Sequence, residues 1–156
     1  MPDLYLFDTS AIVTLTDQEE GAEEVEQLLE EARGNRCRIE ICALSLMEVY
    51  YVALQEHGED EAARLLALVK SWPVTWLYPD ERILLQAARI KAAYRLSFVD
   101  AVIAATAKLR HATLVHKDPE LAALATEVSL SNLPFKKKTS RRAPKRSVRK
   151  QQPDSQ

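Results

Sequence analysis

Short apolar runs and amphipathic stretches alternate along most of the chain. The short runs predict buried strands over residues 4–7, 38–44, 73–77, 112–115 and 127–130. Stretches with apolar residues on one face predict helices over residues 8–15, 20–33, 45–57, 60–70, 83–94, 98–109 and 119–124. Strands separated by helices imply right-handed crossovers and a parallel sheet covered on both faces. We therefore predict a three-layer α/β/α fold with a mostly parallel sheet of four to five strands.

Several predicted helix ends carry residues suited to them. Gly34 and Gly58 follow two predicted helices, and glycine commonly ends a helix. Asp80 and Ser97 precede two others and are predicted N-caps. These markers support the division into helices that the apolar pattern indicates.

The composition is typical of one globular domain. The chain has 156 residues, 47% of them apolar, and only 3 glycines, which suits a helix-rich protein with a real core. No apolar run approaches the roughly 18 residues of a membrane-spanning helix. The start Met1-Pro2-Asp3 also lacks the basic residues of a signal peptide, so we expect a cytoplasmic protein. Cys37 and Cys42 are too few for a disulfide framework or a zinc site, and we expect Cys42 to fill core space.

Charge divides the chain into two unequal parts. Residues 1–135 hold 12 Lys and Arg against 22 Asp and Glu, a net charge of −10, whereas residues 136–156 hold 9 against 1, a net charge of +8. The apolar periodicity also ends at Lys136, and Lys, Arg, Ser, Pro and Gln dominate from there. We predict an acidic domain over residues 1–135 and a basic tail over residues 136–156 that has no core of its own.

Four carboxylates lie at similar points of the predicted fold, although they are far apart in sequence. Each sits where an apolar stretch gives way to a helix, or in a first helical turn: Asp8, Glu48, Asp100 and Asp118. In a parallel sheet such points gather at one edge, where open α/β proteins bind their ligands. Like charges this close resist joint ionisation unless a cation neutralises them. The pattern therefore predicts a divalent-metal site.

Each acid also has a purely structural interpretation. Asp8 and Asp118 suit N-caps, while Ser45 with Glu48 and Ser97 with Asp100 fit capping boxes. Glu48 and Asp100, however, lie beside the apolar stripes of their helices rather than within them. Both are free to face a shared cleft, and this joint pattern favours a site.

The four acids lie in four segments that resemble the acidic motifs of PIN-domain nucleases, in the family's order. The segments are LFDTSAI around Asp8, LSLMEVY around Glu48, LSFVDAVIAATA around Asp100 and ATLVHKDPE around Asp118. The resemblance covers roughly residues 3–133 and is closest to VapC-type toxins of toxin-antitoxin pairs.

This resemblance implies a Mg²⁺- or Mn²⁺-dependent endoribonuclease whose metal site is made by Asp8, Glu48, Asp100 and Asp118. The hydroxyl residues Thr9 and Ser10 match positions beside the family's first acid. The resemblance also implies a homodimer and a cognate antitoxin lying over the acidic cleft. Hard divalent cations prefer oxygen ligands, so the residue types suit this chemistry independently.

Other functions remain as alternatives or are disfavoured. A PIN-like module that only holds RNA or protein is the main alternative, and the presence of all four acids argues against it. A haloacid dehalogenase-type phosphatase needs a second Asp two residues after the first, where this chain has Ser10. A response-regulator receiver is disfavoured because this chain lacks the acidic pair expected near the end of the first strand. For His116 and Lys117 we predict a solvated strand end, with contact to phosphate as the alternative. We expect Trp72 and Trp76 to belong to the core or face a partner rather than to stack on bases.

Overall fold

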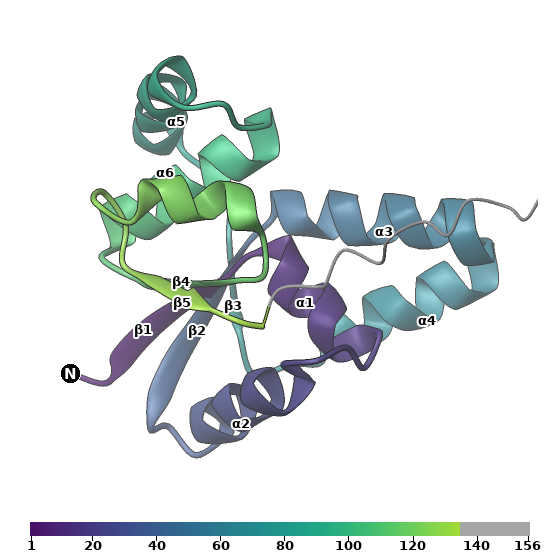
Figure 1. The fold of residues 1–156 in the computed structure, drawn as a ribbon. Helices are drawn as coiled ribbons and strands as arrows, with labels where there is room; N and C mark the ends of the chain where they lie inside the picture. The colour runs from purple at the N-terminus through teal and green to yellow at the C-terminus, as the bar shows by residue number, and fades with distance from the viewer. Residues whose placement is uncertain (135–156) are drawn as a thin grey trace, which may run out of the picture.

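A parallel sheet of five strands forms the centre of the computed structural model, which describes residues 1–134 (Figure 1). The strands are β1 Asp3–Phe7, β2 Cys37–Cys42, β3 Thr75–Leu77, β4 Thr113–His116 and β5 Leu130–Asn132. Their order is β3-β2-β1-β4-β5, and every neighbouring pair is parallel. The predicted α/β class is confirmed.

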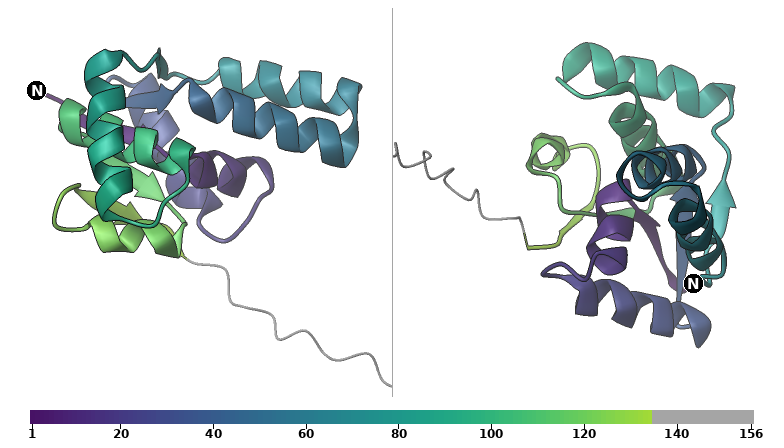
Figure 2. Two further views of the ribbon diagram at one scale, coloured as in Figure 1. Left: turned by 90° about the horizontal axis from the view of Figure 1, so that it is seen from above. Right: turned by 90° about the vertical axis from the view of Figure 1, so that its right-hand side faces the viewer.

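Helices cover both faces of this sheet (Figure 2). They are α1 Thr9–Thr16, α2 Ala22–Arg33, α3 Leu44–His57, α4 Glu59–Lys70, α5 Glu81–Ala93, α6 Phe98–Arg110 and the short 3₁₀ helix η1 Pro119–Leu124. Successive residues of a strand point to opposite faces. Leu6 accordingly packs with α5, α6 and η1, while Phe7 packs with α1 and α2. These two cores make the three-layer arrangement.

The central strand β1 marks a switch point in the topology. After β1 the chain passes over one face to β2 and β3, and it returns through α5 and α6 over the other face to β4, on the far side of β1. The carboxyl ends of β1 and β4 are therefore neighbours, with Phe7 beside Val115. In open α/β sheets this is where ligands bind.

The predicted helix markers agree with the structure. Asp80 caps α5 by accepting a hydrogen bond of 3.0 Å from the Ile83 amide, and Ser97 caps α6 by accepting one of 3.1 Å from the Asp100 amide. Gly58 joins α3 to α4 with a φ of 82°, a left-handed conformation that glycine adopts without steric cost. The resulting α3–α4 hairpin projects beyond the edge of the sheet (Figures 1 and 2).

Two predicted details are wrong. The fifth strand lies at Leu130–Asn132 rather than residues 127–130, because the amides of Glu127 and Val128 bond to the Leu124 carbonyl and close a turn there. Helix α3 begins before Ser45 and has no side-chain cap. Within residues 1–134, no helix is long and apolar enough to cross a membrane.

Candidate active site

The four sequence-predicted acids line one cleft of about 510 Å³ at the carboxyl edge of the sheet. Asp8 follows β1 directly and caps α1, and Asp118 follows β4 and caps η1. Glu48 and Asp100 enter from α3 and α6. The fold therefore brings together residues that are more than 100 positions apart, as the strand-end argument predicts.

Asp8 is the most deeply placed of the four, with only 3% of the residue exposed. Its Oδ2 accepts hydrogen bonds from the Ser10 amide at 3.1 Å and the Ser10 hydroxyl at 2.5 Å. Its Oδ1 is buried and has no hydrogen-bond partner among the described residues. Burial raises the pKa of the Asp8 carboxyl, and the bonds from Ser10 offset part of this rise. An unsatisfied buried carboxylate oxygen is costly unless something in the cleft binds it.

Ser10 links the carboxyl ends of the neighbouring strands β1 and β4. While its hydroxyl donates to Asp8, its oxygen accepts a hydrogen bond of 2.9 Å from the Lys117 amide. These two hydrogen bonds fix the position of Asp8 relative to the segment that carries Asp118.

Glu48 is positioned by Thr9 rather than by a capping box. The Thr9 hydroxyl donates a bond of 2.6 Å to Oε1 of Glu48 and lies 2.9 Å from the Ser45 hydroxyl oxygen. Ser45 is fully buried within α3, so the capping-box interpretation of Ser45 and Glu48 is wrong. Burial raises the pKa of Glu48, the bond from Thr9 lowers it, and the charge of Asp8 raises it further.

Asp100 combines a cap contact with a place in the cleft. Its amide donates to Ser97, as predicted, while its half-buried carboxylate lines the cleft. Burial, followed by the charges of Asp8 and Asp118, raises the pKa of Asp100 from 3.8 to about 7. Without a cation this carboxyl therefore takes up a proton near neutral pH.

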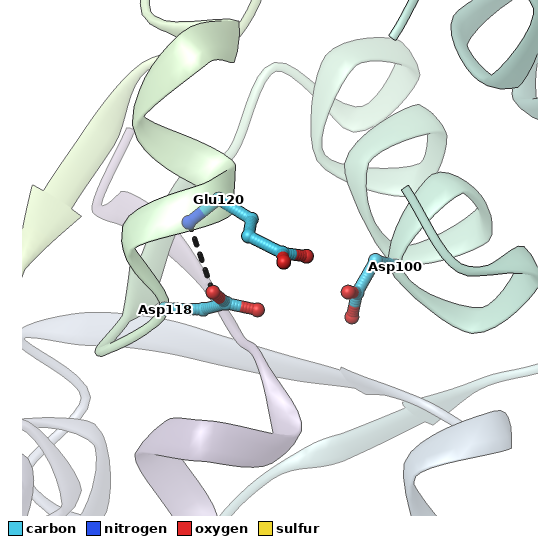
Figure 3. Close-up of side chains that lie close together, drawn as sticks. All are labelled: Asp100, Asp118 and Glu120. Carbon is cyan, nitrogen blue, oxygen red and sulfur yellow. Dashed lines mark hydrogen bonds between the residues drawn. The ribbon is translucent and has the colours of Figure 1, made fainter. Parts of the chain in front are cut away.

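Glu120 is an acid of this region that the sequence prediction missed. Oxygen atoms of Asp100, Asp118 and Glu120 all lie within 4.8 Å of one another, the one such group within residues 1–134 (Figure 3). Asp8 and Glu48 line the same cleft but do not belong to this group. The available signal was the spacing of Asp118 and Glu120, which places the second acid in the first turn of the helix that the first one caps.

The prediction of a solvated strand end at residues 116–117 is wrong. His116 is fully buried, and the Lys117 side chain is only 5% exposed. The Lys117 ammonium donates to the Glu20 carbonyl at 2.5 Å and pairs with a Glu19 carboxylate oxygen at 3.2 Å. The loop between α1 and α2 therefore covers this side chain. Trp72 and Trp76 pack against the core, as predicted.

The donor set fits a hard divalent cation. All the candidate ligands are carboxylate oxygens, which Mg²⁺ and Mn²⁺ prefer over nitrogen or sulfur. A cation in the cleft would bind the unsatisfied Oδ1 of Asp8. Its positive charge would also lower the raised pKa values of Asp8, Glu48 and Asp100. Cys37 and Cys42 are buried and form no disulfide, and neither lines the cleft.

Comparisons with known proteins identify the family. The family model described as PIN domain matches residues 5–127, and no curated protein matches the chain significantly. VapBC2 from Rickettsia felis, solved bound to a promoter DNA fragment, has a TM-score of 0.69 and 16% identity over 84% of this chain and 99% of that one. A toxin-antitoxin complex from Klebsiella pneumoniae has a TM-score of 0.61 and 23% identity over 84% and 98%. VapC20 from Mycobacterium tuberculosis, described as a toxin that cleaves the sarcin-ricin loop, has a TM-score of 0.61 and 17% identity over 78% and 94%.

These identities show a shared fold, and the family model covers most of the chain. The predicted resemblance to VapC-like PIN proteins is confirmed by both. The chain belongs to the PIN domain family.

Proposed function

We propose that this protein is a metal-dependent endoribonuclease that hydrolyses RNA phosphodiester bonds and acts as the toxin of a type II toxin-antitoxin pair. Family membership and the VapC-like fold support a ribonuclease toxin. One observation carries the proposal furthest. Oδ1 of the buried Asp8 carboxylate lacks a hydrogen-bond partner among the described residues, in a cleft that three further predicted acids line. A bound cation would stabilise this buried oxygen, which has no hydrogen-bond donor.

The chain supplies the groups for metal-assisted hydrolysis. Asp8 and Asp100 would be direct ligands of Mg²⁺ or Mn²⁺, Asp118 would be the next, and Glu48 would bind directly or through water. The ion would supply activation of a water molecule and neutralisation of charge on the phosphate and the leaving 3′ oxygen. Ser10 holds Oδ2 of Asp8, which leaves Oδ1 for the ion. Thr9 holds Oε1 of Glu48, which leaves Oε2 to orient or deprotonate water.

The substrate must approach an acidic domain. We propose that residues 1–135 form the nuclease domain and that the basic segment 136–156, which lies outside the described residues, attracts the RNA backbone electrostatically. An RNA substrate of this kind would place the protein in the cytoplasm.

We further propose a cognate antitoxin and a homodimer. The Klebsiella pneumoniae neighbour is described as a toxin-antitoxin complex, and its fold is shared with this chain. A cleft with this many carboxylates suits a partner segment that places a basic side chain among them. Light scattering should find a dimer, and adding the cognate antitoxin should stop cleavage. A monomer whose activity the antitoxin leaves unchanged would contradict both expectations.

Cleavage separates this function from the alternative of a non-cleaving RNA- or protein-binding module. The purified full chain should cut RNA in Mg²⁺ or Mn²⁺ and stop when a chelator is added, and activity should return on adding the metal back. RNA that binds in the presence of metal but stays intact would favour the binding module.

A further inference from the structure

His116 is a fully buried histidine at the carboxyl end of β4, two residues before Asp118. Its Nδ1 accepts a hydrogen bond of 3.2 Å from the Asp118 amide. An imidazole nitrogen that accepts a hydrogen bond carries no proton, so the ring proton lies on Nε2. This contact joins a side chain of the core directly to the backbone of a predicted metal ligand.

The sheet holds His116 in place. In the parallel pairing of β4 with β5, His116 lies opposite Asn132, and its carbonyl accepts a hydrogen bond of 2.7 Å from the Leu133 amide. Because the ring is fully buried, the close packing of the interior restricts it to one orientation. Nδ1 is therefore a fixed acceptor for the chain that follows β4.

Two contacts together set the orientation of Asp118. Its amide lies beyond the end of β4 and before the first turn of η1, and it donates to His116. Its Oδ1 accepts a hydrogen bond of 2.9 Å from the Glu120 amide. Figure 3 shows the second carboxylate oxygen of Asp118 pointing toward Asp100. The backbone contact and the side-chain contact therefore leave one oxygen directed into the cleft.

A purely structural interpretation is that His116 only fills space in the core. In that case any apolar residue of similar size would serve equally well. The pairing of Nδ1 with an amide two residues ahead is more specific, because it is the bond that an Asn or Asp side chain makes in an Asx turn. His116 is also fully buried and does not line the cleft, so it acts on the site only through other residues.

We propose that His116 is a positioning residue of the metal site, whose Nδ1 fixes the Asp118 backbone so that the carboxylate faces the cleft, where it would bind Mg²⁺ or Mn²⁺. The inference rests on the proposed function because it concerns a ligand of the same ion. Groups that orient metal ligands typically contribute about 10- to 100-fold to metal affinity or activity. We expect an effect of that size from His116.

Two substitutions separate the acceptor from the packing of the ring. His116→Asn keeps an oxygen that can accept from the Asp118 amide but leaves a void, whereas His116→Leu fills the space without an acceptor. His116→Asn should therefore lower the thermal midpoint more, yet bind Mn²⁺ nearly as tightly as the wild type. His116→Leu should bind Mn²⁺ about tenfold or more weakly. Calorimetry on the full chain without RNA, at a temperature below all midpoints, measures the affinities.

Two further variants complete the test. His116→Gln places its amide one carbon further from the backbone, so it should lose affinity as His116→Leu does, and it replaces His116→Leu if that variant does not fold. Thr106→Val is the matched control. Thr106 is also fully buried, and its hydroxyl donates a hydrogen bond of 2.7 Å to the Val102 carbonyl of its own helix. Losing that bond should leave Mn²⁺ affinity unchanged.

The possible outcomes separate this inference from the proposed activity. Affinity that follows stability, with His116→Asn the weakest binder, would overturn the inference, and so would wild-type affinity in His116→Leu and His116→Gln. Either result would leave the ribonuclease assignment standing. A wild type that binds no Mn²⁺ would overturn the metal-dependent function and the inference together. The expected pattern in a chain that cleaves no RNA would support the inference and refute the assignment.

Discussion

The Thr9 hydroxyl donates a hydrogen bond of 2.6 Å to Oε1 of Glu48, joining residues 39 positions apart. Thr9 follows the first predicted acid directly, so the start of α1 both places Asp8 and orients the acid contributed by α3. The geometry of the cleft therefore depends on hydroxyl groups as well as on its carboxylates.

Replacing Thr9 should impair the site without unfolding the protein. In Thr9→Val, Glu48 loses the bond that lowers its pKa, so it should be protonated more readily and bind metal less well. Loss of such a supporting bond typically costs about 10- to 100-fold in metal affinity or activity. Calorimetry with Mn²⁺ measures the loss. Thr16→Val in the same helix is the control, because the Thr16 hydroxyl donates to the Val13 backbone carbonyl. Equal losses in the two variants would show that the bond to Glu48 is unimportant.

The stability of the metal-free protein should depend on Asp100. Because the pKa of Asp100 rises from 3.8 to about 7 on folding, its protonated form favours the folded state. This contribution is complete below about pH 4 and is lost as the pH rises through about 7. The thermal midpoint should fall over that range, and Asp100→Asn should reduce the fall. Asp60→Asn, at an exposed acid in the first turn of α4, should keep it. Identical pH profiles for the two variants would contradict the assignment.

The buried ion pair of Lys117 should matter more than an exposed one. Lys117→Met removes the ammonium opposite Glu19, whose side chain is only 15% exposed, and breaking a buried pair in this way costs about 3 kcal/mol. Arg64→Met breaks the exposed pair with Glu61 and should cost less than about 1 kcal/mol. Urea unfolding measures both free energies. A similar small loss in both variants would mean that the loop over Lys117 adds little stability.

The basic segment makes a separate prediction. Truncation after Phe135 removes all nine Lys and Arg of residues 136–156. If they contact RNA phosphates, truncation should weaken binding and flatten its salt dependence, while cleavage of saturating RNA stays nearly unchanged. Filter binding over a range of salt concentrations tests this. An unaltered slope would mean that the segment takes no part in capturing RNA.

The sequence predicts those parts of the site that depend on local pattern. Asp8 and Asp118 were located because each follows a strand and caps a helix, and both features leave a mark in neighbouring residues. The bond from Thr9 to Glu48 depends on how α1 packs against α3, which no local pattern records. Lys117 was predicted to be solvated because the loop that covers it lies almost 100 residues earlier in the chain. Glu120 was missed because its approach to Asp100 depends on the placement of η1 beside α6.

Cleavage of RNA by Asp8→Asn and Asp100→Asn, measured in Mn²⁺ under single-turnover conditions, tests the metal-dependent ribonuclease most directly. Circular dichroism should show both variants folded, because Asn keeps the shape of each side chain and removes only its charge. We predict that both lose cleavage, while Asp60→Asn, with the same change at an exposed helix start, cleaves at the wild-type rate. Full activity in Asp100→Asn would contradict the account.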